Sequence, residues 1–102
     1  MLSIEHHAAQ KFSSDAMLAM QDGNAANARR LYKKAAKLEA AALKKVEPRE
    51  IRTQGILAVS LVAMLLKAGL KEDAETEARR FLVVIAGPNK LWSPTACDKI
   101  LA

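Results

Sequence analysis

Cysteine is nearly absent from this chain, since Cys97 is the single one among 102 residues. Without a second thiol the chain cannot form an internal disulfide, so a framework of disulfide bonds is excluded. Such cysteine usage is typical of reducing compartments, and we expect a cytoplasmic location. Cys97 itself is expected to act as a small apolar residue, because a catalytic cysteine needs a base beside it.

Aromatic residues and long apolar runs are also scarce. Two phenylalanines, one tyrosine and one tryptophan are present, so the core must be built from Ala, Leu, Val, Ile and Met. The longest apolar stretch, residues 56–66 with Ser60 inside it, is about half of the roughly 20 residues that cross a bilayer. We therefore expect a core helix there and no membrane partner. The first residues also lack the basic start and apolar run of a secretion signal.

Motifs for catalysis are missing as well. The sequence contains no glycine-rich phosphate loop, no nucleophile elbow and no zinc-binding helix motif. His6 and His7 would point about 100° apart on a helix, so they cannot chelate one metal ion together. Clustered carboxylates suit the partly positive start of a helix, and these are Glu72, Asp73, Glu75 and Glu77. We expect no enzyme activity, no cofactor and no metal site.

Apolar residues make up half of the chain and recur with helical periodicity. No segment alternates with period two between turn residues, so no strand is predicted. The pattern predicts one all-α domain over residues 1–102, with two antiparallel helical hairpins and a short C-terminal capping helix. Pro48 and Pro94 are expected in the first turns of the third and fifth helices. The expected helices cover residues 3–22, 24–45, 48–68, 71–86 and 94–101.

Two turns share one pattern, in which a glycine after an apolar helix precedes an alanine by five residues: Gly23…Ala28 and Gly69…Ala74. Glycine can end a helix in the left-handed conformation, and the small alanine lets the next helix lie close to the first. Asn24 is a suitable N-cap for the helix that follows. This spacing predicts two helical hairpins.

Periodicity also divides the helices into faces. The apolar face of helix 3–22 is expected to hold Ala8, Ala9, Phe12, Ala16, Ala19 and Met20, and its polar face His6, His7, Gln10, Ser14 and Gln21. Glu39 lies inside the apolar stripe of helix 24–45, and a buried carboxylate needs a partner. Helix 48–68 is apolar on nearly all sides, so neighbours must cover it on more than one face.

Each hairpin resembles a tetratricopeptide repeat, a family in which large and small apolar residues recur at fixed offsets across a helix-turn-helix. The residues that carry the resemblance are Phe12…Ala16…Ala19…Gly23…Ala28…Tyr32…Ala35 and Ala58…Leu61-Val62…Leu65…Gly69…Ala74…Ala78…Phe81. The two glycines are 46 residues apart, whereas the family period is about 34. We therefore expect a longer second helix or an expanded linker. The resemblance implies a right-handed stack or bundle that binds protein segments.

The first hairpin is also similar to the opening hairpin of microtubule-interacting-and-trafficking domains, which are three-helix bundles that dock partner helices in a groove. This resemblance covers Asp22-Gly23-Asn24-Ala25…Ala28…Leu31-Tyr32…Ala35 followed by Leu38-Glu39. Both families imply the same class of function, the binding of protein segments.

Positive charge is concentrated in the second helix and the turn after it. Residues 29–52 hold nine basic and three acidic residues, whereas the rest of the chain holds seven basic and eight acidic ones. At about 100° per residue, seven of the basic residues fall within an arc of about 160° opposite the apolar stripe. This basic face consists of Arg29, Arg30, Lys33, Lys34, Lys37, Lys44 and Lys45.

Three interpretations of the basic face stay open. It is an ordinary solvated helix face, a docking strip for an acidic protein, or a weak nucleic-acid contact. No aromatic residues interleave with the charges, so the stacking platforms that bind single strands are missing.

A second candidate surface is apolar and lies near the C-terminus, where Val83 and Val84 fall on the outer side of the fourth helix and Leu91 and Trp92 follow in a loop. Clustered exposed apolar groups mark interaction surfaces. Alternatively, Trp92 and the last helix fold back over the two valines as a lid.

The pattern as a whole predicts a non-enzymatic protein-protein interaction module or adaptor. Its partner, another protein of acidic character, would bind in the groove between the first and third helices or on the basic face. The alternatives are a homodimer that buries the apolar surface of helix 48–68, and weak nucleic-acid binding through the basic face.

Overall fold

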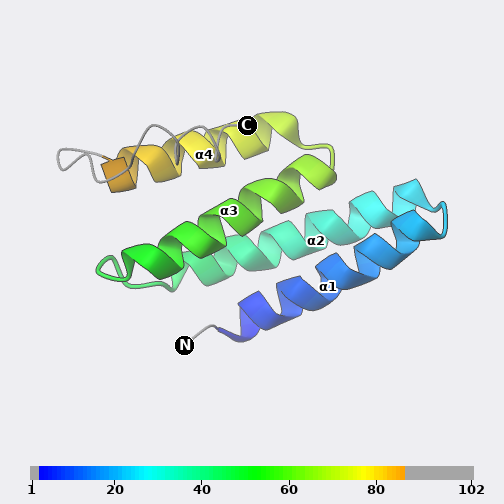
Figure 1. Cartoon of the computed structure of the whole chain (residues 1–102), viewed down its shortest axis with the longest axis horizontal. Helices are drawn as coiled ribbons and strands as arrows, with labels where there is room; N and C mark the ends of the chain where they lie inside the picture. Colours follow the sequence, from blue (N-terminus) through cyan, green and yellow to red (C-terminus); the bar gives the residue numbers. More distant parts are fainter. Residues whose placement is uncertain (1–2, 87–102) are drawn as a thin grey trace.

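The computed structural model describes residues 3–86, with the side chains of residues 84–86 left aside. This part of the chain forms four α-helices, α1 (Ile4–Gln21), α2 (Ala25–Lys44), α3 (Ile51–Lys67) and α4 (Lys71–Ala86). Each helix runs antiparallel to the one before it, and consecutive helices pack against each other (Figure 1). The expected all-α arrangement of antiparallel helices is confirmed for residues 3–86, where no strand occurs. The expected helix 94–101 lies outside the described residues.

The turns after α1 and α3 have the same geometry, as their shared sequence pattern predicts. Gly23 and Gly69 adopt φ angles of +80° and +82°. After α1, the amide of Asn24 donates to the carbonyl of Ala19 at 2.9 Å and that of Gly23 donates to the carbonyl of Met20 at 3.1 Å. These two bonds form a Schellman motif, which satisfies the last carbonyls of a helix. The Asn24 side chain then accepts a hydrogen bond from the amide of Asn27 and caps α2 as expected.

Pro48 does not begin the third helix, so that prediction is wrong. The amide of Glu50 donates to the carbonyl of Glu47 at 2.9 Å, which makes Pro48 the second residue of a β-turn. Proline suits that position as well as it suits a first helical turn, because both need a φ near −65°. α3 begins three residues later at Ile51, and the Gln54 side chain secures the turn by donating to the carbonyl of Glu47 at 3.0 Å.

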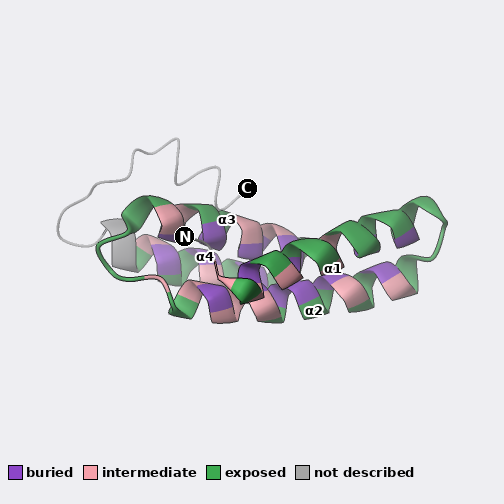
Figure 2. Ribbon diagram, turned by 90° about the horizontal axis from the view of Figure 1, so that it is seen from below, coloured by how far each residue is buried: buried purple, intermediate pink, exposed green. Residues whose placement is uncertain are grey.

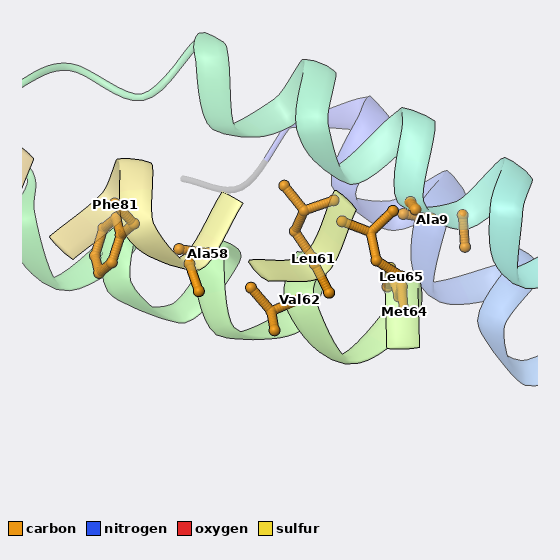
Figure 3. Packing of buried hydrophobic residues seen from close by; sticks show 11 residues of the cluster. Ala9, Ala58, Leu61, Val62, Met64, Leu65 and Phe81 are labelled. Atoms are coloured by element: carbon orange, nitrogen blue, oxygen red, sulfur yellow. The ribbon is translucent and has the colours of Figure 1, made fainter. Parts of the chain in front are cut away.

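The core is built mainly of alanine and aliphatic residues, as the scarcity of aromatic residues predicts. α3 supplies most of its large aliphatic members (Figure 3), and α2 and α4 contribute alanines, whose small side chains let helices pack closely. Phe81 joins the cluster from α4. The core positions of both tetratricopeptide-like stretches are buried, including Ala28 and Tyr32 in the first and Leu61 and Ala78 in the second.

Two face assignments on α1 are wrong. His6 is buried rather than solvent-facing, because it precedes the fully buried Ala9 by three residues and shares its face. Met20 is exposed, since α1 packs chiefly against α2 and much of its outward surface stays uncovered (Figure 2).

α3 is covered by α2 on one side and by α4 on the other, as its apolar sequence predicts. Its remaining face stays open within residues 3–86, where Ile56, Val59 and Leu66 are 57%, 46% and 43% exposed. None of the helices in this part of the chain combines the length and apolar character needed to span a membrane.

Candidate functional site

A groove lies between α2 and α4, and it follows from the way the helices pack. Among the described helices, extensive contacts join only neighbours in the chain, so α2 and α4 flank α3 without extensive contact with each other. Between them are two adjoining hollows of about 340 and 350 Å³. Ala40, Leu61, Glu77 and Arg80 line both hollows, which makes them one continuous surface. We call this surface the α2–α4 groove. This groove lies between a different pair of helices from the first and third, between which the sequence predicted a groove.

The floor of the α2–α4 groove is apolar. Leu61 and Leu65 extend from α3 toward α2, and both are buried at their base in the core (Figure 3). Ala36 and Ala40 form the α2 side of the floor, and their small side chains are the reason that the surface is hollow there. Leu43 and Phe81 line the end of the groove nearest Gln54.

The two walls of the groove carry opposite charge. Lys33, Lys37 and Lys44 line the α2 wall, and they lie within about 40° of one another on the helix surface because they are four and seven residues apart. None of the three lysines has an ion pair or hydrogen bond within residues 3–86.

The α4 wall carries Asp73 and Glu77 and, one turn later, Arg80. Arg80 donates from Nη1 to Glu77 Oε1 at 3.2 Å, so this cation is paired within its own helix. The hydroxyl of Thr76, between them, donates to the carbonyl of Glu72 at 3.0 Å. The α4 wall is therefore more acidic than the wall of lysines that faces it.

The basic face predicted on the second helix is exposed along its whole length, but its members have different surroundings. Lys34 stands over the ring of Phe12 with 5.8 Å between Nζ and the ring centroid. Arg30 donates through two nitrogens to the side-chain oxygen of Asn27. Arg29 and Arg30 lie in the first turns of α2 and line neither hollow. Of the basic residues predicted on this face, Lys33, Lys37 and Lys44 therefore lie along the groove, whereas Lys34 contacts α1.

Lys45 also contacts α1, because its Nζ donates a hydrogen bond to Glu5 Oε1 of that helix at 2.6 Å. This hydrogen bond, with the positive charge of Lys45, holds the pKa of the Glu5 carboxyl below its ordinary value. The carboxylate therefore stays ionised to lower pH when the two helices are packed. Lys45 is committed to α1 and is not a free cation of the groove.

Of the apolar patch predicted near the C-terminus, the structure describes the side chain of one residue only. Val83 is 73% exposed on α4. The side chain of Val84, and Leu91 and Trp92 altogether, lie outside the described residues.

A buried polar pair links α1 to α2 on the side away from the α2–α4 groove. Nδ1 of His6 lies 2.7 Å from Oε1 of Glu39, and the Glu39 side chain is fully buried. The second oxygen, Oε2, has no hydrogen-bonding partner among the described residues. His6 is thus the partner that the buried carboxylate of Glu39 was predicted to need.

We compared the chain with known protein families, with curated proteins and with solved structures. No match was found in any of the three comparisons. Within residues 3–86, no cluster of three or more His, Cys, Asp or Glu side chains could hold a metal ion.

Sequence reasoning found the lysines of the groove but missed its other wall and its floor. Asp73 and Glu77 were interpreted only as residues that favour a helix start, because a helical wheel shows one helix at a time. A signal for the opposite wall does exist. Asp73 and Glu77 are four residues apart, as are Lys33 and Lys37, and the predicted chain order places their helices on either side of α3.

Proposed function

We propose that this chain is a non-enzymatic protein-interaction module of the tetratricopeptide-like type, and that it binds a segment of a partner protein in the α2–α4 groove. One observation carries the proposal: an apolar floor lies beside three exposed lysines that have no partner within the described residues. An apolar hollow with a polar rim is a general mark of a binding site.

The structural core supports the tetratricopeptide-like part of the proposal. The small residues of both matched stretches lie where consecutive helices approach closely, and the two turns have one geometry. The 20 residues of α2 and the turn at residues 45–50 account for the long spacing between the two glycines.

The chemistry of the groove favours binding over catalysis. Its described polar groups are lysines, one arginine, two carboxylates, the Gln54 amide and a hydroxyl that donates to its own helix. None of the described residues that line it is a histidine or a cysteine, and none pairs a nucleophile with a base. The same groove is a poor site for nucleic acid, because Asp73 and Glu77 would face the phosphates.

A peptide-display selection tests the proposal. Ala40 lines both hollows, so Ala40→Gln places a long polar side chain in the groove. Peptides selected on the unmodified protein are expected to lose at least about tenfold in affinity for this variant, which corresponds to about 1.4 kcal/mol. Ala26→Gln is the matched control, since Ala26 is exposed on the same helix away from the groove. Equal binding to both variants, or no enriched peptide, would contradict the proposal.

A second candidate function is self-association through α3. The observation that favours it is the row of exposed Ile56, Val59 and Leu66 on one face of that helix. Around Ile51, Gly55 and Ile56 this face forms a shallow, almost entirely apolar surface. Because it lies on a different face of α3 from Leu61 and Leu65, a dimer formed there leaves the groove accessible.

A further inference from the structure

The shape and charge of the α2–α4 groove restrict the kind of segment that it can bind. We propose that its occupant is an amphipathic α-helix of a partner protein, with apolar residues on one face and carboxylates along one flank that lies against Lys33, Lys37 and Lys44. This inference rests on the proposed function and adds the chemistry of the partner.

The helical form of the occupant follows from the floor. The groove offers two hollows in line, each about as large as a small ligand pocket. Large side chains at positions i and i+4 or i+7 of one helix face fill two such hollows in turn. Residues 3–86 present no sheet edge to which an extended segment could add as a strand.

The length of the occupant follows from the lysine row. Lys44 follows Lys33 by 11 positions in α2, a distance of about 16 Å along the helix axis. A partner helix of about three turns covers this length. Carboxylates spaced four and seven residues apart on one of its flanks would match the three lysines one to one.

The acidic flank follows from the difference between the two walls. All three lysines of the α2 wall are exposed and unpaired among the described residues, whereas the one arginine of the α4 wall is already bonded to Glu77. Asp73 and Glu77 would repel carboxylates on the opposite flank. The groove therefore favours an acidic flank on the α2 side only, and electrostatic complementarity of this kind selects among partners.

Three synthetic peptides of equal length test the inference on the full chain. All carry the same leucine face, and one flank bears glutamates, lysines or glutamines at the lysine-row spacing while the other flank bears glutamines. At low salt the glutamate peptide is expected to bind about tenfold more tightly than the glutamine peptide, because three exposed charge pairs each add a modest attraction. The preference should shrink as salt rises. Fluorescence anisotropy measures all three affinities.

Charge reversal on the protein completes the test. Lys33→Glu/Lys37→Glu/Lys44→Glu is expected to reverse the order, so that the lysine peptide binds more tightly than the glutamate peptide. The matched control Arg30→Glu/Lys34→Glu/Arg52→Glu changes the net charge equally at exposed residues outside the groove and should keep the original order. Circular dichroism checks that both variants fold.

The outcomes separate the two proposals. If all three peptides bind equally and Ala40→Gln weakens them, the groove binds protein segments but the acidic flank is wrong. If the control variant also binds the lysine peptide more tightly than the glutamate peptide, the preference among peptides comes from the net charge of the protein. The inference is then overturned. If none of the three peptides binds, the inference is again overturned, and the groove is not the binding site for a partner segment.

Discussion

The buried pair of His6 and Glu39 is the most consequential polar contact at the scale of single residues. It places a carboxylate with no exposed surface in the α1–α2 interface, near the first turn of α1, and only one of its two oxygens has a partner among residues 3–86. A buried polar group is stabilising only when its hydrogen bonds are made, so this pair makes the interface sensitive to either partner. It also fixes the position of α1 along α2.

Replacing one residue of this pair should lower the free energy of unfolding far more than replacing both. His6→Leu leaves the enclosed Glu39 carboxylate without its bond and is expected to lower the free energy of unfolding by about 3 kcal/mol. The double variant His6→Leu/Glu39→Leu should lie within about 1 kcal/mol of the unmodified protein, since two apolar side chains replace the pair. Urea unfolding followed by circular dichroism measures all three.

The neighbouring histidine supplies the control for this comparison. His7 is exposed, and His7→Leu is expected to change the free energy of unfolding by less than about 0.5 kcal/mol. The interpretation of a mutually dependent pair would be contradicted if His6→Leu/Glu39→Leu lost as much stability as the separate losses of His6→Leu and Glu39→Leu added together.

At the scale of elements, the two Schellman turns decide where the helices end. Each glycine has a positive φ, and a Cβ built on either one would meet no atom within 4 Å. Any loss of stability on substitution must therefore come from backbone conformation and not from steric contact. This separation makes the turns a clean test of the hairpin interpretation.

Gly69→Ala is expected to lower the free energy of unfolding by about 1 kcal/mol, because an L-residue is disfavoured in the left-handed region. Gly69→Asn should lower the free energy of unfolding by a smaller amount, since asparagine tolerates the left-handed region better than alanine does. Gly23→Ala should match Gly69→Ala, because the two turns make the same hydrogen bonds. Thermal and urea unfolding measure the differences. No change in Gly69→Ala would show that the turn does not need a left-handed residue.

The helices themselves could be predicted from sequence, because their ends are marked by local chemistry. Gly23, Asn24 and Gly69 act through hydrogen bonds to residues within one turn, so their roles do not depend on the rest of the fold. Pro48 was misplaced for the opposite reason. A proline fits a β-turn and a first helical turn equally well. Pro48 lies in a β-turn because the amide of Glu50 donates a hydrogen bond to the carbonyl of Glu47.

The groove could be predicted only in part, because it depends on which helices are neighbours in space. Lys33, Lys37 and Lys44 were identified from their periodicity on one helix. Their separation from Lys34 and Lys45 depends on α1, which contacts those two through Phe12 and Glu5. His6 was predicted on the polar face because its side chain is polar, although it lies one turn before Ala9 and shares the face of that residue.

At the scale of the whole molecule, packing between consecutive helices leaves surfaces on both sides of α3. One is the α2–α4 groove, and the other is the row of Ile56, Val59 and Leu66. A module that binds a partner segment on one side can therefore associate with a second copy on the other. The two functions proposed above use different faces of the same helix and are compatible.

Self-association through α3 gives the last prediction. Static light scattering over micromolar concentrations should show a mass that rises toward twice that of the monomer, because burial of exposed apolar surface drives association. Val59→Lys places a charge in the middle of the exposed row and should hold the protein at the monomer mass. Leu18→Lys is the control, since Leu18 is also an exposed apolar residue but lies on α1, and it should leave the association unchanged. A strict monomer at every concentration would contradict the dimer, whereas equal loss in both variants would place the contact elsewhere than on α3 alone.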